Sequence, residues 1–216
     1  MKNLKTMLFT FVAIMGLTNA SNAFMENVYF EVGTSAVGVE ADGNHNDAQS
    51  QVTTGAVGKT AVTGSYGLGY MLGSGTLGLD LGYMVTPGEA KIRSTSDSNS
   101  GKDVSLEISD MTEMYVAPML NMTDDASLYL KYGWNSTDLT TVGDVNKINS
   151  MDGNTVAIGT VMSWGSNLYI RTEVGMTEYD KLTFTGLGNT NGVPTTETVT
   201  ATPDVHYGKI AVGYKF

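Results

Sequence analysis

The chain has 216 residues, of which 22 are acidic and 12 are basic, and its formal net charge is -10. This acidic balance argues against nucleic acid as a partner, because binding to phosphates requires a basic surface. The sequence contains no cysteine, so it has neither disulfides nor thiolate metal sites. Its 26 glycines and 11 tyrosines, with only 4 prolines, are typical of a glycine-rich wall of strands with aromatic rims.

The first 23 residues have the pattern of a secretory signal. Lys2 and Lys5 give a positive start, residues 7–17 are apolar, and Ala23 ends a segment suited to cleavage. We therefore predict a signal peptide over 1–23 and a single mature domain over 24–216. The apolar stretch is too short to cross a bilayer as a helix, which takes about 20 residues. The pattern excludes a helical membrane protein and disfavours a cytoplasmic enzyme, although ordinary soluble secreted proteins share such a signal.

The rest of the chain alternates between apolar and polar residues in segments that turn residues separate, and this predicts eight strands. They cover 28–40, 55–71, 76–86, 104–121, 127–140, 153–164, 168–184 and 205–216. The connections 72–75, 122–126 and 165–167 are short, and the connections 41–54, 87–103, 141–152 and 185–204 are long. The pattern indicates an all-β fold, an eight-stranded antiparallel up-and-down transmembrane β-barrel with short periplasmic turns and long external loops.

The two faces of these strands differ in chemistry. One face is apolar, with aromatic residues such as Tyr66, Trp134 and Trp164 near strand ends, where a membrane barrel has its interfacial girdles. The other face carries glycines and charges of both signs. We therefore predict that the apolar face meets lipid and the polar face lines the lumen. The same alternation also fits a soluble barrel that encloses an apolar cavity.

The lumen of an eight-stranded barrel is just wide enough for side chains to fill it. We predict that seven charged residues on the polar face contact one another there as a structural plug, because unpaired charges in a confined interior are costly. They are Glu31, Asp80, Glu113, Lys131, Arg171, Glu173 and Lys209. A narrow ion-conducting path through the same charges is the alternative.

The last strand is expected to close the barrel against the first. Ile210, Val212, Tyr214 and Phe216 lie on one face and are predicted to form the terminal assembly strand. The blocks 154–159, 167–179 and 211–216, with an inward Arg171 and Glu173 in the second, resemble the last strands of OmpA-like and OmpX-like outer-membrane barrel domains. Ala211 stands where that family often has glycine. Because the chain stops at Phe216, we expect no periplasmic peptidoglycan-binding domain.

Other chemical signals are weak. His45 lies near Asp42 and Asp47 in a polar segment, and we expect these residues to be solvated, with neither a metal site nor a cofactor. A membrane-embedded lipid hydrolase would need a base such as His206 within reach of a nucleophile, and none is close in sequence. We therefore predict no catalytic residues and no enzyme activity, with a lipid hydrolase as a further alternative.

The resulting prediction is a monomeric surface barrel of the bacterial outer membrane, with a role in adhesion or envelope integrity. Its long loops would carry recognition, because loops on a rigid scaffold commonly do so. The expected partners are outer-membrane lipid and lipopolysaccharide, an unknown extracellular ligand and, during biogenesis, periplasmic chaperones and the barrel-assembly machinery.

Overall fold

The computed structural model describes residues 27–46, 52–94, 104–142, 148–190 and 193–216. The predicted signal peptide over 1–23 lies outside these residues, as do Asp47 and the middle parts of the long connections. Among the described residues, no helix is long and apolar enough to cross a membrane.

Nine strands make up almost all of this part of the chain. They are β1 (Val28–Asn46), β2 (Val52–Ser74), β3 (Leu77–Ser94), β4 (Val104–Asn121), β5 (Ala126–Val142), β6 (Ser150–Trp164), β7 (Leu168–Tyr179), β8 (Leu182–Thr190) and β9 (Val193–Lys215).

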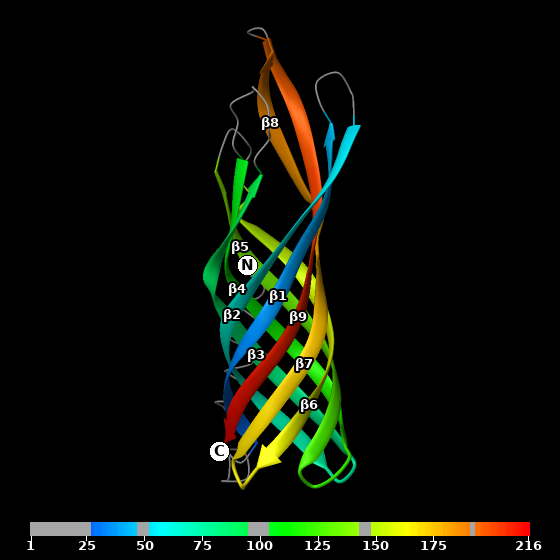
Figure 1. Ribbon diagram of the computed structural model, residues 1–216. Helices are drawn as coiled ribbons and strands as arrows, with labels where there is room; N and C mark the ends of the chain where they lie inside the picture. The colour runs from blue at the N-terminus through cyan, green and yellow to red at the C-terminus, as the bar shows by residue number, and fades with distance from the viewer. Residues whose placement is uncertain (1–26, 47–51, 95–103, 143–147, 191–192) are drawn as a thin grey trace, which may run out of the picture.

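Eight of the strands close into an antiparallel barrel. Consecutive strands from β1 to β7 pair with their neighbours, β7 pairs with β9, and β9 pairs with β1 (Figure 1). The backbone N–H of Phe216 donates to the carbonyl of Val28 at 2.9 Å, so the last residue joins the first strand. The ninth strand, β8, pairs only with β9 among the described strands and lies outside the closed wall. The predicted eight-stranded barrel is therefore confirmed.

An apolar belt surrounds the barrel. Large apolar side chains on the outer face are exposed, for example Leu68 at 56% and Trp164 at 71%, whereas charged side chains fill the interior. Such a surface is stable in lipid, where a closed barrel leaves no unpaired strand edge within the wall. The apolar face therefore points outward, and the alternative of a soluble barrel with an apolar cavity is wrong. The protein is therefore a transmembrane β-barrel.

The two ends of the barrel differ. At one end, the turn end, β2 joins β3, β4 joins β5 and β6 joins β7 through the short connections predicted from sequence. Gly75 and Gly165 occupy left-handed conformations in two of these turns, with φ of 69° and 75°. At the other end, the hairpin end, the strands continue beyond the predicted boundaries.

The segments predicted as long loops are in large part strands. β1 runs to Asn46 and β2 begins at Val52, so most of 41–54 is a hairpin, and β3 continues to Ser94 within 87–103. The range 185–204 belongs mainly to β8 and β9, and 141–152 contains the ends of β5 and β6. The predicted strand 168–184 is divided, because Asp180 and Lys181 separate β7 from β8. The expected loops are thus corrected to paired strand extensions.

A bulge in β4 also changes one predicted face. The register between β4 and β5 shifts between Ser109 and Thr112, and Asp110 has a positive φ of 49°. Strict alternation along 104–121 would place Ile108 on the apolar face toward lipid, but it packs against a buried apolar cluster inside the barrel. An inserted residue reverses the alternation, which a count of every second residue does not reveal.

Candidate functional site

The interior of the barrel contains all seven charged residues that the sequence singled out. They come from six strands: Glu31 from β1, Asp80 from β3, Glu113 from β4, Lys131 from β5, Arg171 and Glu173 from β7, and Lys209 from β9. Each is at most 5% exposed. Inward-facing positions of strands that are far apart in sequence thus meet in one layer, as the narrow lumen of an eight-stranded barrel requires.

Arg171 forms the centre of one group of ion pairs. Its Nη2 lies 2.7 Å from Oδ2 of Asp80, and its Nε lies 2.9 Å from Oε2 of Glu31. The other oxygen of Glu31, Oε1, is 3.0 Å from Nζ of Lys209. Four strands, β1, β3, β7 and β9, are therefore tied across the lumen by charges that are buried from solvent.

Lys131 forms the second group. Its Nζ donates to Oε1 of Glu173 at 2.6 Å and to Oε2 of Glu113 at 3.0 Å. These three residues connect β4, β5 and β7. Charge-assisted hydrogen bonds of this length are among the strongest in proteins, and in this lumen they replace the lost hydration of the buried ions.

Four tyrosine rings surround the guanidinium of Arg171. The centroids of Tyr29, Tyr115, Tyr129 and Tyr169 lie 5.2–5.9 Å from its Cζ. Aromatic faces attract cations, especially where water is excluded. Nε and Nη1 of Arg171 have no hydrogen-bond partner among the described residues. Nε is ion-paired with Glu31, and the ring faces stabilise the rest of the guanidinium charge.

The tyrosine hydroxyls bind the carboxylates of the same layer. Tyr29 donates to Asp80 at 2.8 Å, and Tyr169 donates to Glu31 at 3.0 Å. Glu173 accepts from Tyr129 at 2.6 Å and from Tyr207 at 2.7 Å. The sequence placed most of these tyrosines on the polar face but did not identify them as site residues.

A simple signal could have identified the four rings of the cage. Each stands two residues from a lumen charge on its own strand, as Tyr29 does from Glu31 and Tyr169 from Arg171. Residues at i and i+2 lie on the same face of a strand. Tyrosine beside a charge on an inward face therefore predicts a hydrogen-bonded pair in such a lumen.

Glycines on neighbouring strands make room for the rings. Tyr29 pairs in register with Gly69, and Tyr169 pairs with Gly213. The positions of a Cβ added at these two glycines coincide with the tyrosine ring. Gly82 and Gly159 have the same relation to Tyr115 and Tyr129. Glycine on the inner wall is thus a packing requirement of the cage.

One further atom of the charged layer is unsatisfied. Oε1 of Glu113 is buried without a hydrogen-bond partner among the described residues. The layer holds four carboxylates and three cations, so one negative charge is in excess. This oxygen lies beside Gly133 on β5. Because glycine has no side chain, no side-chain atom separates the oxygen from the β5 backbone.

Above the charged layer, toward the hairpin end, the lumen changes character twice. The first zone consists of hydroxyl and amide side chains. Here the hydroxyl of Thr155 is hydrogen-bonded to Asn135 and, at 2.6 Å, to the hydroxyl of Thr177. Beyond them lies an inner apolar cluster of buried side chains. Its members are Leu139, Met151, Tyr179, Leu182, Phe184 and Val205, with Val37, Val39, Ile108, Met111 and Ile148 packed against them.

The inner apolar cluster was not predicted from the sequence. Leu182 and Phe184 come from β8, the strand outside the wall, and Ile108 reaches the cluster through the bulge in β4. The lumen is therefore filled by an ion-paired layer, a layer of hydroxyl and amide side chains and, toward the hairpin end, an apolar layer.

Neither histidine belongs to the charged layer of the lumen. His206 is exposed on the outer wall, and its side chain has no hydrogen-bond partner in the part of the chain that the structure describes. The backbone of His45 pairs with Thr53 and Val199. Among the described residues, no group of three or more His, Cys, Asp or Glu side chains could hold a metal ion.

The terminal strand presents Ile210, Val212, Tyr214 and Phe216 outward, each about half exposed. The rings of Tyr214 and Phe216 pack edge to face at 5.3 Å at the turn end. Inside the wall, Ala211 pairs with Gly33, where an added Cβ would come within 2.8 Å of the Ala211 methyl. The small residue that the barrel needs at this level is thus supplied by β1.

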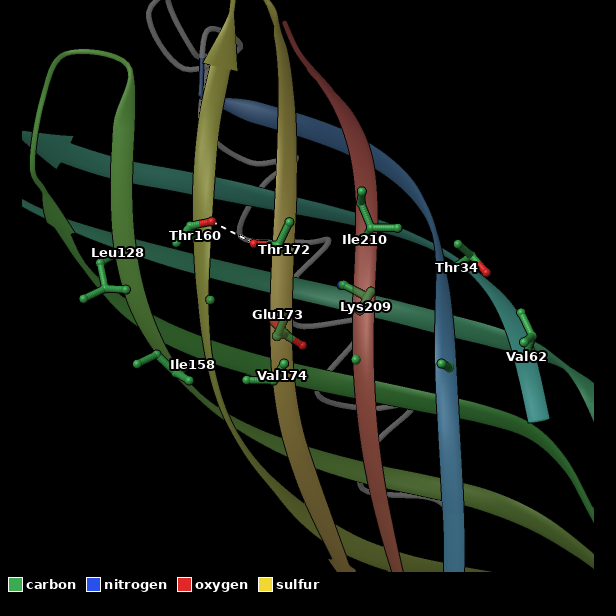
Figure 2. Close-up of a pocket in the computed structure, with 13 residues that line it drawn as sticks. Thr34, Val62, Leu128, Ile158, Thr160, Thr172, Glu173, Val174, Lys209 and Ile210 are labelled. Carbon is green, nitrogen blue, oxygen red and sulfur yellow. Dashed lines mark hydrogen bonds between the residues drawn. The ribbon is translucent and has the colours of Figure 1, made fainter. Parts of the chain in front are cut away.

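A surface hollow lies on the outer wall within the apolar belt. Figure 2 shows it across β5, β6, β7, β9, β1 and β2, with the hydrogen bond of 2.8 Å between Thr160 and Thr172. It is shallow and open, and its outward lining consists of threonines, glycines and aliphatic side chains. The two charged residues that border it, Glu173 and Lys209, point inward to their ion pairs. This hollow faces hydrocarbon and has no group suited to catalysis.

Comparison with known proteins gives likenesses of fold. No family model and no curated protein sequence matches the chain. Among solved structures, the outer membrane protein OprG from Pseudomonas aeruginosa is similar with a TM-score of 0.52 and 13% identity, over 88% of this chain and 97% of that one. The outer membrane protease OmpT from Escherichia coli is similar with a TM-score of 0.50 and 9% identity, over 89% and 97%.

Both likenesses concern architecture, because the identities are too low to transfer an activity. They agree with the closed antiparallel wall described above. The chain therefore has the fold of the OmpA-like and OmpX-like outer-membrane β-barrels.

Proposed function

We propose that the protein is a structural surface barrel whose lumen is closed to ions and whose hairpin end faces the outside of the cell. The observation that carries this proposal is the buried ion-paired layer, in which Arg171 and Asp80 are 0% exposed. A permeating ion would have to displace charges that are already paired and hydrogen-bonded, at a cost of several kcal/mol for each ion left uncompensated.

The layered filling supports the same function. An ion that passed the charged layer would have to cross the inner apolar cluster as well, where the hydroxyl of Tyr179 is already bonded to Thr137 and Met111. The hairpin end extends the barrel by paired strands, which present a surface of fixed shape. Such a scaffold suits adhesion or a stabilising role in the envelope.

Single-channel recording in planar lipid bilayers tests the closed lumen. The refolded wild-type protein is expected to leave the bilayer insulating at neutral pH and moderate salt. A variant with Tyr129→Ala and Lys131→Ala, which removes two buried lumen side chains, is expected to conduct. The control variant Thr160→Val with Thr172→Val changes only the outer wall and is expected to insulate like the wild type.

The alternative of a narrow channel makes the opposite prediction. Discrete openings of the wild-type protein, lost when it is heat-denatured before addition, would overturn the closed-lumen proposal. A wide porin in the same apparatus shows that openings are detectable. Lipid hydrolysis is checked separately by incubation with outer-membrane lipid, comparing the wild type with His206→Ala, and no release of acyl chains is expected.

A further inference from the structure

Four strands continue past the barrel as one sheet. β2 pairs with β1 up to Val52, β1 pairs with β9 up to Thr198, and β9 pairs with β8. The order β2-β1-β9-β8 makes a four-stranded blade, formed by β1 from Glu40, β2 up to Gly58, β9 up to Asp204 and all of β8. It projects from the hairpin end in Figure 1.

The two faces of the blade differ. One face continues the inner surface of the barrel and carries Leu182 and Phe184, which are buried in the inner apolar cluster. The other face continues the outer wall and is polar. Because paired residues in a sheet point to the same side, the register places Thr54, Asn44, Thr200 and Thr183 in one row across the four strands.

A hollow of about 570 Å³ lies on this polar face. Asp42 and Thr202 pair one row closer to the barrel, and Lys181 borders them where β8 begins. The lining residues are Asp42, Gly43, Asn44, Thr54, Lys181, Thr200 and Thr202. Hydroxyl, amide, carboxylate and ammonium groups therefore share one concave surface, without a large apolar side chain.

These side chains are available to a ligand. Within the described part of the chain, none of the polar side chains in the hollow has a hydrogen-bond or ion-pair partner. The sheet holds them at a regular spacing, about 4.8 Å between strands and about 6.8 Å between alternate residues of one strand. A rigid array of donors and acceptors matches a chain of hydroxyl groups, because little entropy is lost in ordering it.

The surrounding charge selects against anions. Glu40 pairs with Asp204, and Asp204 pairs with Glu178, on the outer side directly below the hollow. Lys181 is the one cation of the lining, which also contains the carboxylate of Asp42. A sulfated or phosphorylated ligand would meet more repulsion than attraction here, whereas an uncharged ligand would not.

We propose that the polar face of the blade binds an uncharged polysaccharide presented from outside the cell, with Thr200, Thr202 and Asn44 bonding to sugar hydroxyls. This inference rests on the proposed function in one respect, that the hairpin end is external. The proposed function names neither a ligand nor a binding site, and this inference supplies both.

The test uses the full chain refolded in lipid nanodiscs and applied to an array of neutral, sialylated and sulfated oligosaccharides. Retention on neutral glycans is expected, with little on the anionic ones. The strongest neutral ligand is then titrated by calorimetry. Replacing two hydroxyls by methyls in the variant Thr200→Val with Thr202→Val is expected to weaken binding by about tenfold.

Thr140→Val is the matched control, because Thr140 is exposed on the outer part of β5, away from the hollow. It is expected to bind like the wild type. The proposal fails if no neutral glycan is retained, if sialylated or sulfated sugars bind better, or if the double variant binds unchanged. Conductance of the same preparation reports on the closed lumen alone, so a failure of one proposal is distinguishable from a failure of the other.

Discussion

Arg171 shows at the scale of one residue how the lumen is held together. Its guanidinium carries the positive charge between Asp80 and Glu31 and lies among four tyrosine rings. A buried ion pair contributes little when compared with a well-packed apolar pair, but removing one partner leaves an uncompensated charge. The charges of the lumen therefore depend on one another.

Replacing Arg171 by methionine is expected to lower the free energy of unfolding by about 3 to 5 kcal/mol, because Asp80 loses its cation. The measurement is urea-induced unfolding in lipid vesicles, followed by tryptophan fluorescence. The double variant Arg171→Met with Asp80→Asn is expected to recover part of the loss, since the uncompensated charge is then absent. Asp125→Asn, at an exposed turn, is the control. A loss in Arg171→Met no larger than in this control would contradict the proposed structural role.

Two glycines of β9 give a matched test of the tyrosine cage. An added Cβ at Gly213 would overlap the ring of Tyr169, whereas one at Gly208 would meet nothing within 4 Å. Gly213→Ala is expected to destabilise the barrel by about 1 to 3 kcal/mol, the usual range for overpacking. Gly208→Ala is expected to leave the unfolding midpoint unchanged or slightly raised. Equal midpoints for both variants would show that the ring moves aside freely.

Single residues also show what the sequence could predict about the site. The inward positions of Arg171 and Glu173 followed from alternation alone, because one face of β7 is apolar and the other is not. The partners of each charge did not follow, since they depend on the stagger between strands and on side-chain length. The missing partner of Glu113 Oε1 is a detail of this kind.

At the scale of elements, alternation predicted the barrel wall well and the hairpin end poorly. The short turns fell where glycine and aspartate indicated them, at Gly75 and at Asp124 and Asp125. The blade was taken for loops because its strands are rich in Thr, Asn, Asp and Gly, which turns also use. In the structure, pairing with β1 and β9 outweighs these local preferences, as β-propensity is strongly dependent on context.

Phe184 tests how β8 is attached to the barrel. It is 8% exposed and packs into the inner apolar cluster. Phe184→Ala is expected to lower the cost of opening the β8 and β9 hairpin by up to about 3 kcal/mol, which raises the open population by up to roughly a hundredfold. Limited proteolysis of folded protein should then cut within β8 much faster than in the wild type.

The control for this experiment is Thr183→Ala, whose side chain is exposed on the polar face next to Phe184. It is expected to be cut at the wild-type rate. If Phe184→Ala were equally resistant, the apolar cluster would not be what holds β8. If Phe184→Ala instead unfolded the whole barrel, β8 would unfold cooperatively with the strands of the wall.

At the scale of the whole molecule, the positions of the two tryptophans define the depth of the belt. Trp134 on β5 pairs with Asn154 near the start of β6, and Trp164 ends the same strand. The ten residue-to-residue steps from 154 to 164 span about 33 Å of strand, which a tilt of about 40° reduces to about 25 Å along the barrel axis. This equals the height of the apolar band of outer-membrane barrels, so the two rings should lie at opposite interfaces.

Quenching by brominated lipids tests this placement. The single-tryptophan variants Trp134→Phe and Trp164→Phe are both expected to be quenched more by bromine near the headgroups than by bromine at the chain ends. Ile158 is exposed about midway between the two levels, so Ile158→Trp in a background without other tryptophans should show the reverse order. If either native tryptophan were quenched mainly by bromine at the bilayer centre, the apolar belt would lie at a different height along the barrel from the one inferred above. This result would also move the blade and its polar hollow relative to the membrane surface, since the wall is one rigid sheet from Trp164 to the hairpin end.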